Sequence, residues 1–322
     1  MRLKHGFVRD ILGKKELPII LFTILVYMTF SVMAPNFNNL NNVAVIAQQI
    51  TINGIVALGM TIVIMIGGMD LSVGSVLSLC GVLAGMMDNA GVPVPVTVLL
   101  TLLTGMALGA LNGLLIVKLN IPDIIVTLAT MNIFRGLAVM ITKSQWITDF
   151  SSGFLRIGSG KGGFFSVPII LYAALAVLFA IGLKWLPFGR LLYAVGGNRE
   201  AASLMGLNVA RVKVKVYTID GFLLGLAGLL FASMFGSIQA ATAATSMQFQ
   251  TMGSALIGGA NIFGGAGSVL GTVFGTILLG MIKNGLVQIH ASEYWLDFIT
   301  GSVILLALMV NLIQVRRKKG GA

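Results

Sequence analysis

Charged side chains are scarce in this chain of 322 residues: 21 Lys or Arg and 10 Asp or Glu make up 10% of it, against 57% hydrophobic residues. A water-soluble domain of this length needs a mostly polar or charged exterior to stay in solution. A disordered chain would also be poor in apolar residues. The composition therefore excludes both classes and predicts a membrane protein.

Cysteine and histidine are almost absent as well. Cys80 is the only cysteine, so no disulfide can form within the chain, and His5 and His290 are the only histidines. A structural zinc site or a nucleophilic triad needs several convergent ligands of these types. We therefore expect no catalytic residue, no metal site and no cofactor bound by this chain, and we expect Cys80 to be a small core residue.

The net charge of +11 would suit nucleic acid if the basic residues formed one patch. They are instead confined to short tails and loops between apolar runs. We therefore expect contact with membrane lipid and no nucleic acid partner.

Charge-free runs predict the membrane spans, because about 20 apolar helical residues cross the hydrocarbon core. Such runs occupy residues 17–33, 43–69, 71–87, 89–117, 162–183, 298–315 and 221–282, and the last is long enough for up to three spans. Residues 124–141 add one more, interrupted only by Arg135. The expected fold class is therefore all-α, a polytopic membrane protein with about ten transmembrane helices.

Basic residues in short loops predict the orientation, since they remain on the cytoplasmic side. Under ten spans, sixteen fall on one side, in residues 1–16, 184–215 and 316–319 and at Lys118, and four fall on the other. Both termini are thus expected in the cytoplasm, with residues 1–16 and 316–322 as tails and 17–315 as a single transmembrane domain. Residues 17–33 could alternatively be a signal peptide, but the run is longer than usual for one.

Glycines recur at four-residue spacing at Gly105, Gly109 and Gly113, and again at Gly271 and Gly275. On a helix this spacing lets a neighbouring helix approach closely. Plain helix packing is one interpretation, and an interface that slides during a conformational change is the other.

Two similar glycine-interrupted segments lie far apart, at residues 66–77 and 257–270, each with a polar residue after the glycine pair. We expect Asp70 and Asn261 to cap the helices that resume there. Matching broken helices in two halves indicate pseudo-repeated halves around a transport pathway. As an alternative, Asp70 is only a cap at the membrane surface.

Polar side chains within the apolar runs are candidates for lining that pathway. Arg135 is costly in a span unless it faces protein or water, so it serves either structural pairing or the pathway. Amide side chains suit a neutral polar cargo, although interhelical hydrogen bonding is the simpler role for most of them. The pathway candidates are Asn53, Asp70, Ser72, Asn132, Arg135 and Asn261.

The cytoplasmic segment 187–215 contains a short helix-forming piece between Gly197 and Gly206. Asn198 is suited to the N-cap, and Glu200 falls in the first turn, where its charge favours the helix dipole. A short helix held outside the membrane between spans suits docking of a cytoplasmic partner.

Glu200-Ala201-Ala202, followed after three residues by Gly206, resembles the EAA loop of ABC-importer permeases. Together with Gly59-Met60-Thr61, residues 67–75, Arg135-Gly136 and residues 193–198, it makes the chain similar to permeases of the ribose, galactose, rhamnose and autoinducer-2 group. The resemblance covers roughly residues 17–315, and the segments at 127–130 and 293–299 resemble the rhamnose and autoinducer-2 branch more than the ribose branch.

This resemblance implies a permease subunit that imports a monosaccharide or similar neutral polyhydroxylated solute by alternating access. It implies a second permease subunit, two cytoplasmic ATPase domains that bind ATP and magnesium, and an extracytoplasmic sugar-binding protein meeting residues 36–42, 143–161 and 283–293. It implies a bacterial inner-membrane location. The residues it assigns to ATPase coupling are Asn198, Arg199, Glu200, Ala201, Ala202, Gly206, Leu207 and Asn208.

The main alternative is an ion-coupled secondary transporter or a channel. Such a protein needs no cytoplasmic docking loop and is expected to carry carboxylates inside its spans. By the span boundaries above, Asp70 is the only such residue. An intramembrane enzyme is disfavoured by the shortage of His, Cys and paired carboxylates.

Overall fold

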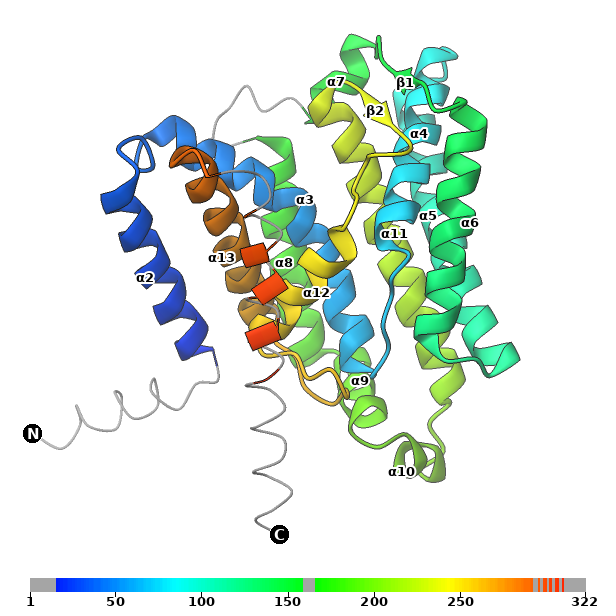
Figure 1. The fold of residues 1–322 in the computed structure, drawn as a ribbon. Coiled ribbons are helices and arrows are strands. Elements are labelled where there is room, and N and C mark those ends of the chain that lie inside the picture. The colour runs from blue at the N-terminus through cyan, green and yellow to red at the C-terminus, as the bar shows by residue number, and fades with distance from the viewer. Residues whose placement is uncertain are drawn as a thin grey trace, which may run out of the picture.

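The computed structural model describes residues 16–158 and 166–291, together with positions 295, 298, 299, 301, 302, 305, 306 and 309. Figure 1 shows helices that run side by side along one common direction. In chain order the elements are α2 Leu17–Met33, α3 Leu40–Met65, α4 Val73–Asn89, α5 Val94–Leu119, α6 Asp123–Thr142, β1 Trp146–Ile147, α7 Ser152–Gly158, α8 Val167–Trp185, α9 Pro187–Gly197, α10 Arg199–Leu204, α11 Val209–Phe235, β2 Ile238–Gln239, α12 Met247–Ile257 and α13 Val269–Gln288.

Six of these helices are long and apolar enough to cross a membrane, among the residues that the structure describes: α3, α5, α6, α8, α11 and α13. The apolar helices α2 and α4 are shorter, at 17 residues each, and α12 has only 11. The polytopic helical architecture is thus as expected, whereas the count of about ten spans remains a prediction. The tails 1–15 and 316–322 and most of the expected last span lie outside the described residues.

The sequence predicted that a span begins at residue 221, with the charge-free run 221–282. The structure shows that the helix begins earlier. Helix α11 begins at Val209, inside the expected cytoplasmic loop, and continues to Phe235. It therefore carries Arg211, Lys213, Lys215 and Asp220. The interpretation failed because protein, and not lipid, surrounds this helix: 67% of its most apolar window is buried inside the chain.

Helices α3, α4 and α11 form the centre of the molecule, and α5 packs along α11 through glycine. A Cβ atom on Gly105 would meet the carbonyl oxygen of Gly221, and one on Gly109 would meet that of Tyr217. Gly113 continues this face against Val214. The four-residue glycine spacing thus lets the two backbones approach without side chains between them.

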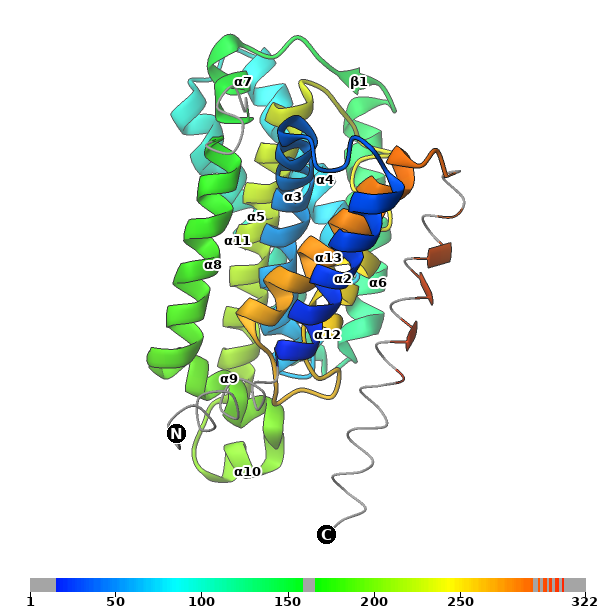
Figure 2. The same cartoon turned by 90° about the vertical axis from the view of Figure 1, so that its left-hand side faces the viewer.

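The two ends of the bundle differ in structure (Figures 1 and 2). Helices α9 and α10 project from one end, which we call the α10 end, and α7 with the strands lies at the opposite end. There β1 pairs antiparallel with β2, Trp146 opposite Gln239 and Ile147 opposite Ile238. Basic residues of the described chain favour the α10 end: Lys118, Lys184, Arg190, Arg199, Arg211, Lys213 and Lys215, against Lys143, Arg156 and Lys283.

The two broken segments meet at the α10 end. The backbone N–H of Gly265 donates to the carbonyl oxygen of Met65 at 2.9 Å, and a Cβ atom on Gly264 would lie 2.8 Å from the nitrogen of Gly67. Left-handed backbone at Gly67 (φ 68°) and Gly264 (φ 89°) makes these turns, which side chains would strain. The breaks therefore form one joint between α3–α4 and α12–α13.

The expected capping by Asp70 and Asn261 is wrong. Asp70 accepts from the backbone N–H of Ser72, and Asn261 from that of Phe263, so each closes a local turn two residues long. The cap of α13 is Ser268, which accepts from Gly271. Several residues separate Asn261 from that helix, which is too far for a side-chain cap.

Candidate functional site

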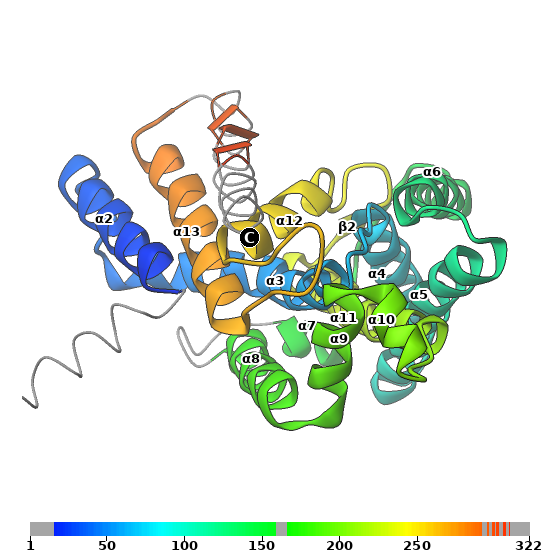
Figure 3. The same cartoon turned by 90° about the horizontal axis from the view of Figure 1, so that it is seen from below.

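Helix α10 at the exposed end of the molecule is the first candidate site. The Asn198 side chain accepts from the backbone N–H of Ala201 and caps the helix, as the sequence predicts. Gly206, with φ 82°, ends it in the left-handed conformation, and Asn208 then caps α11 by accepting from Arg211. Viewed from below, α9 and α10 cover the end of α11 (Figure 3).

Exposed apolar side chains distinguish the tip of α10. Leu204 is 90% exposed and Met205 is 81% exposed, whereas Ala202 and Leu207 turn toward the bundle and pack with its core. Glu200 and Ala201 are also exposed. Two large apolar side chains so fully exposed beyond the apolar spans suit burial against another protein.

Arg199 connects α10 to the joint between the broken helices. Its guanidinium donates to the carbonyl oxygens of Ile66 at 3.0 Å and Gly67 at 3.1 Å. Helix α9 adds a second link, because the Tyr193 hydroxyl donates to the carbonyl oxygen of Gly267 at 3.0 Å. Displacement of α9 and α10 would therefore pull on both broken segments.

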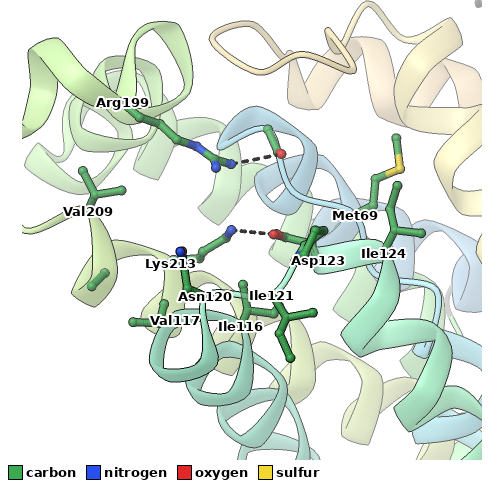
Figure 4. A pocket seen from close by; sticks show the side chains of 13 residues that line it. Met69, Ile116, Val117, Asn120, Ile121, Asp123, Ile124, Arg199, Val209 and Lys213 are labelled. Atoms are coloured by element: carbon green, nitrogen blue, oxygen red, sulfur yellow. Dashed lines mark hydrogen bonds and ion pairs between the residues drawn. The ribbon is translucent and has the colours of Figure 1, made fainter.

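Beside Arg199 lies a pocket of about 590 Å³, here called the inner pocket (Figure 4). Lys213 of α11 donates to Asp123 of α6 at 2.5 Å, and Tyr217 donates to the same carboxylate at 2.9 Å. Across this space Arg199 points to the loop that carries Met69, and Lys213 points to Asp123. The pocket thus brings charged side chains from three helices to the base of the coupling segment.

A second cavity, of about 560 Å³, opens toward the opposite end of the bundle and is here called the outer cavity. Amide side chains line it, and Asn53 of α3 donates to Gln250 of α12 at 3.3 Å. Its remaining polar and aromatic lining residues include Gln48, Gln49, Thr242, Thr245, Lys283, Phe231 and Phe235. Apart from Lys283, these hydrogen-bonding groups are neutral, and neutral groups beside aromatic faces suit a polar, uncharged solute.

Of the predicted pathway residues, Asn53 alone lines the outer cavity in the described chain. Asp70 and Ser72 are buried deeper, where Ser72 donates to Asp70 and accepts from Asn112. Asn132 is exposed on α6, where its amide donates to the carbonyl oxygen of Leu128. Asn261 lies in the turn between α12 and α13. The six candidates thus do not line one cavity of the described chain, and their role in a pathway stays a prediction.

Arg135 pairs with the backbone. It donates to the carbonyl oxygens of Ala240 at 2.6 Å and Ala243 at 2.7 Å. These residues begin the loop that supplies Thr242, Ala244 and Thr245 to the outer cavity. The arginine therefore has a structural partner and at the same time holds part of the cavity wall.

Sequence reasoning missed Asp220. This residue lies in the middle of α11 with no exposed surface, next to Asp70. The available signal was the polar series Lys213, Tyr217 and Asp220, whose spacing places all three on one helix face.

The predicted glycine pair Gly271 and Gly275 lies against the backbone of Gly258 and Ser254, so α12 and α13 pack closely.

No group of three or more His, Cys, Asp or Glu side chains that could hold a metal occurs among the residues described.

No solved structure matches the chain. A family model, the permease component of branched-chain amino acid transport systems, matches residues 42–308. The chain belongs to this family. It is therefore a multi-pass membrane transport permease.

Curated relatives refine this family assignment. A ribose import permease protein of Haemophilus influenzae is 36% identical over 89% of this chain and 90% of its own. The ribose import permease protein of Bacillus subtilis is 36% identical over 87% and 88%, respectively. An autoinducer 2 import system permease protein of Photorhabdus luminescens is 31% identical over 93% and 90%. The suspected permease family is confirmed, whereas these identities do not favour the autoinducer-2 branch over the ribose branch.

Proposed function

We propose that this chain is the transmembrane permease subunit of an ATP-driven importer for a monosaccharide or a similar small, neutral, polyhydroxylated solute. The relatives named as ribose and autoinducer 2 import permeases support this cargo class. The observation that carries the proposal is α10 itself, with its apolar tip exposed and its base tied to the broken helices.

The coupling residues are those from Asn198 to Asn208. Leu204 and Met205 enter a groove of the ATPase, where burial of their apolar surface stabilises the contact by about 1.5–3 kcal/mol for each fully buried side chain. Arg199 then transmits the movement of α10 to Gly67, and through Gly264 and Gly265 to the second broken segment. Both breaks move together because they already touch.

The outer cavity receives the cargo. Its amides offer paired donors and acceptors to hydroxyl groups, and Phe231 and Phe235 offer apolar faces to the ring carbons. The external segments 36–42, 143–161 and 283–293 of this chain meet the sugar-binding protein. Within these segments, residues 159–161, 292 and 293 lie outside the residues that the structure describes. The loop held by Arg135 is the movable wall of this cavity.

The complete importer contains a second permease subunit, two cytoplasmic ATPase domains and an extracytoplasmic sugar-binding protein. ATP and magnesium bind the ATPase subunits and not this chain. The α10 end faces the cytoplasm of a bacterial inner membrane, in agreement with the excess of basic residues there. Residues 17–315 form one transmembrane permease domain, flanked by cytoplasmic tails at 1–16 and 316–322.

Co-purification tests the docking claim. The chain is solubilised from its native membrane, and an ATP-binding-cassette subunit is sought in the eluate by mass spectrometry. Leu204→Asp should abolish its recovery, because a charge replaces the apolar tip. Leu119→Asp is the matched control, since Leu119 is 58% exposed at the same end of the bundle but outside α10. Equal recovery from both variants would refute docking through α10.

A further inference from the structure

Two carboxyl groups lie side by side in the interior of the bundle. Asp70 belongs to the break between α3 and α4, and Asp220 belongs to the middle of α11. Asp70 is 1% exposed and Asp220 is 0% exposed, and the two side chains are neighbours. The two acids are 150 positions apart, so only the fold brings them together.

The two neighbours differ in the donors that reach them. Asp70 accepts hydrogen bonds from the backbone and the hydroxyl group of Ser72, at 2.7 Å and 2.6 Å. Neither oxygen of Asp220 accepts from any N–H or O–H group among the residues described. Its neighbour, a second carboxyl group, has no hydrogen to donate when both are ionised.

The surroundings cannot accommodate two negative charges. The backbone of α3 presses on Asp220, because a Cβ atom on Gly59 would collide with its Oδ1 atom. Asn112 is fully buried beside Ser72, and its Oδ1 atom has no donor within the described chain. Adjacent ionised carboxylates in a dry interior repel strongly, and burial disfavours each of them separately.

We propose that Asp70 and Asp220 form a buried proton-binding site, in which Asp220 is protonated and donates its hydrogen to the ionised carboxylate of Asp70. One proton removes the repulsion and supplies the missing donor at once. The shared hydrogen joins α11 to the α3–α4 break, the segment whose backbone carbonyl oxygens Arg199 also holds. The site therefore stabilises the packing of the elements that α10 moves.

The charged and titratable groups facing the pair are few. Helix α11 contributes Lys213 and Tyr217, α6 contributes Asp123, and α10 contributes Arg199 through its contact with the break. Helices α3 and α4 present only neutral groups there, since Asp88 lies at the far end of α4. Helix α5 contributes Asn112, which donates to Ser72, and carries Lys118 in its last turn at the α10 end. No cation directly neutralises the pair among these described neighbours.

The inner pocket lies beside the pair, because Met69, next to Asp70 in the chain, lines it. The Tyr217 hydroxyl has two acceptors within reach, the carbonyl oxygen of Met69 and the carboxylate of Asp123, and donates its one hydrogen to either. Asp123 in turn accepts from Lys213, and Met69, Asp123 and Lys213 all line the inner pocket. We therefore expect the proton to exchange from the α10 end of the molecule rather than from the outer cavity.

Infrared spectroscopy of the purified full-length permease in an ester-free detergent tests the site, whether or not the chain imports sugar. At neutral pH the wild type should show the carbonyl stretching band of a protonated carboxylic acid, shifted in heavy water. Asp220→Asn should abolish the band, because its amide permanently supplies the donor. Asp88→Asn should leave it unchanged, since Asp88 accepts from the backbone N–H and the hydroxyl of Ser151 and lies outside the pair.

A thermal unfolding series provides the second readout. The folded chain binds a proton that unfolded carboxylates release at neutral pH, so wild-type stability should fall as the pH rises, and Asp220→Asn should remove this loss. Absence of the infrared band in the wild type would overturn the proposal and indicate two ionised groups. A band that appears only when choline replaces sodium in the buffer would also overturn it and indicate a bound cation. If Asp220→Asn fails to fold, the wild-type band and its loss at alkaline pH still decide the question.

Discussion

Arg199 donates a hydrogen bond to the carbonyl oxygen of Gly67, 132 positions earlier in the chain. The contact joins the exposed helix α10 to the joint where both broken segments meet. The same guanidinium nitrogen also donates to the carbonyl oxygen of Ile66, so it bridges two successive carbonyl groups.

Arg199→Ala should uncouple transport from ATP hydrolysis. Hydrogen bonds to a charged group contribute about 1.5–3 kcal/mol each, so loss of both should reduce ATP-driven uptake roughly 10-fold or more, while the ATPase subunits still co-purify. Arg190→Ala is the matched control, because Arg190 is an exposed arginine of the neighbouring helix α9. Uptake rates in reconstituted vesicles give the comparison, and equal rates for the two variants would remove Arg199 from the coupling route.

Gly221→Ala should destabilise the contact between α5 and α11. The added methyl group meets the carbonyl oxygen of Gly105 and the backbone of Gly109, and such overpacking costs about 1–3 kcal/mol. Gly136→Ala adds the same group to α6 with no atom within 4 Å of it. The control should therefore be neutral or slightly stabilised, because alanine favours helix more than glycine does. Thermal unfolding in detergent separates the two, and equal melting temperatures would contradict the close packing.

Lys213→Met should be more harmful than the loss of a surface ion pair. It leaves Asp123 buried with Tyr217 as its remaining donor, and an unpaired buried charge costs about 3–5 kcal/mol. The double variant Lys213→Met with Asp123→Asn removes the stranded charge and should recover part of the loss. Unfolding free energies for the single and double variants measure this recovery. A double variant less stable than Lys213→Met would show that no charge had been stranded.

Asn53→Leu should weaken uptake of the proposed cargo. The change removes one amide from the outer cavity, and one lost hydrogen bond of about 1.4 kcal/mol corresponds to a 10-fold effect. Asn132→Leu provides the control, since Asn132 is an exposed amide of α6 outside that cavity. Initial uptake rates at limiting sugar decide between them. If Asn132→Leu has the larger effect, the cargo does not pass through the outer cavity.

Local chemistry explains what the sequence predicts well. The cap at Asn198 and the left-handed Gly206 depend on neighbouring residues only, so the bounds of α10 follow from the sequence. The glycine spacing in α5 likewise predicts a face for close packing. Its partner could not be predicted, because Gly221 and Gly225 lie on a helix more than 100 positions away.

Contacts made by the fold explain what was missed. The acceptors of Arg135 are backbone carbonyl oxygens, which every residue has, so no sequence signal marks Ala240 and Ala243. Asp220 escaped notice because a search for charge-free runs starts a span after the last charge. Protein neighbours, rather than lipid, surround that part of α11, and they allow an acid where the membrane would not.

The buried acid pair also makes the competing function testable, since carboxylates inside the spans are what an ion-coupled carrier needs. The decisive measurement is sugar uptake into proteoliposomes that contain the permease, with or without its ATPase subunits, with saturating binding protein outside and ATP inside. Our account predicts that sugar uptake requires both ATP and the ATPase subunits. It also predicts that the Leu204→Asp variant shows no such uptake. Uptake by the permease alone, driven by a proton gradient and indifferent to ATP, would contradict it.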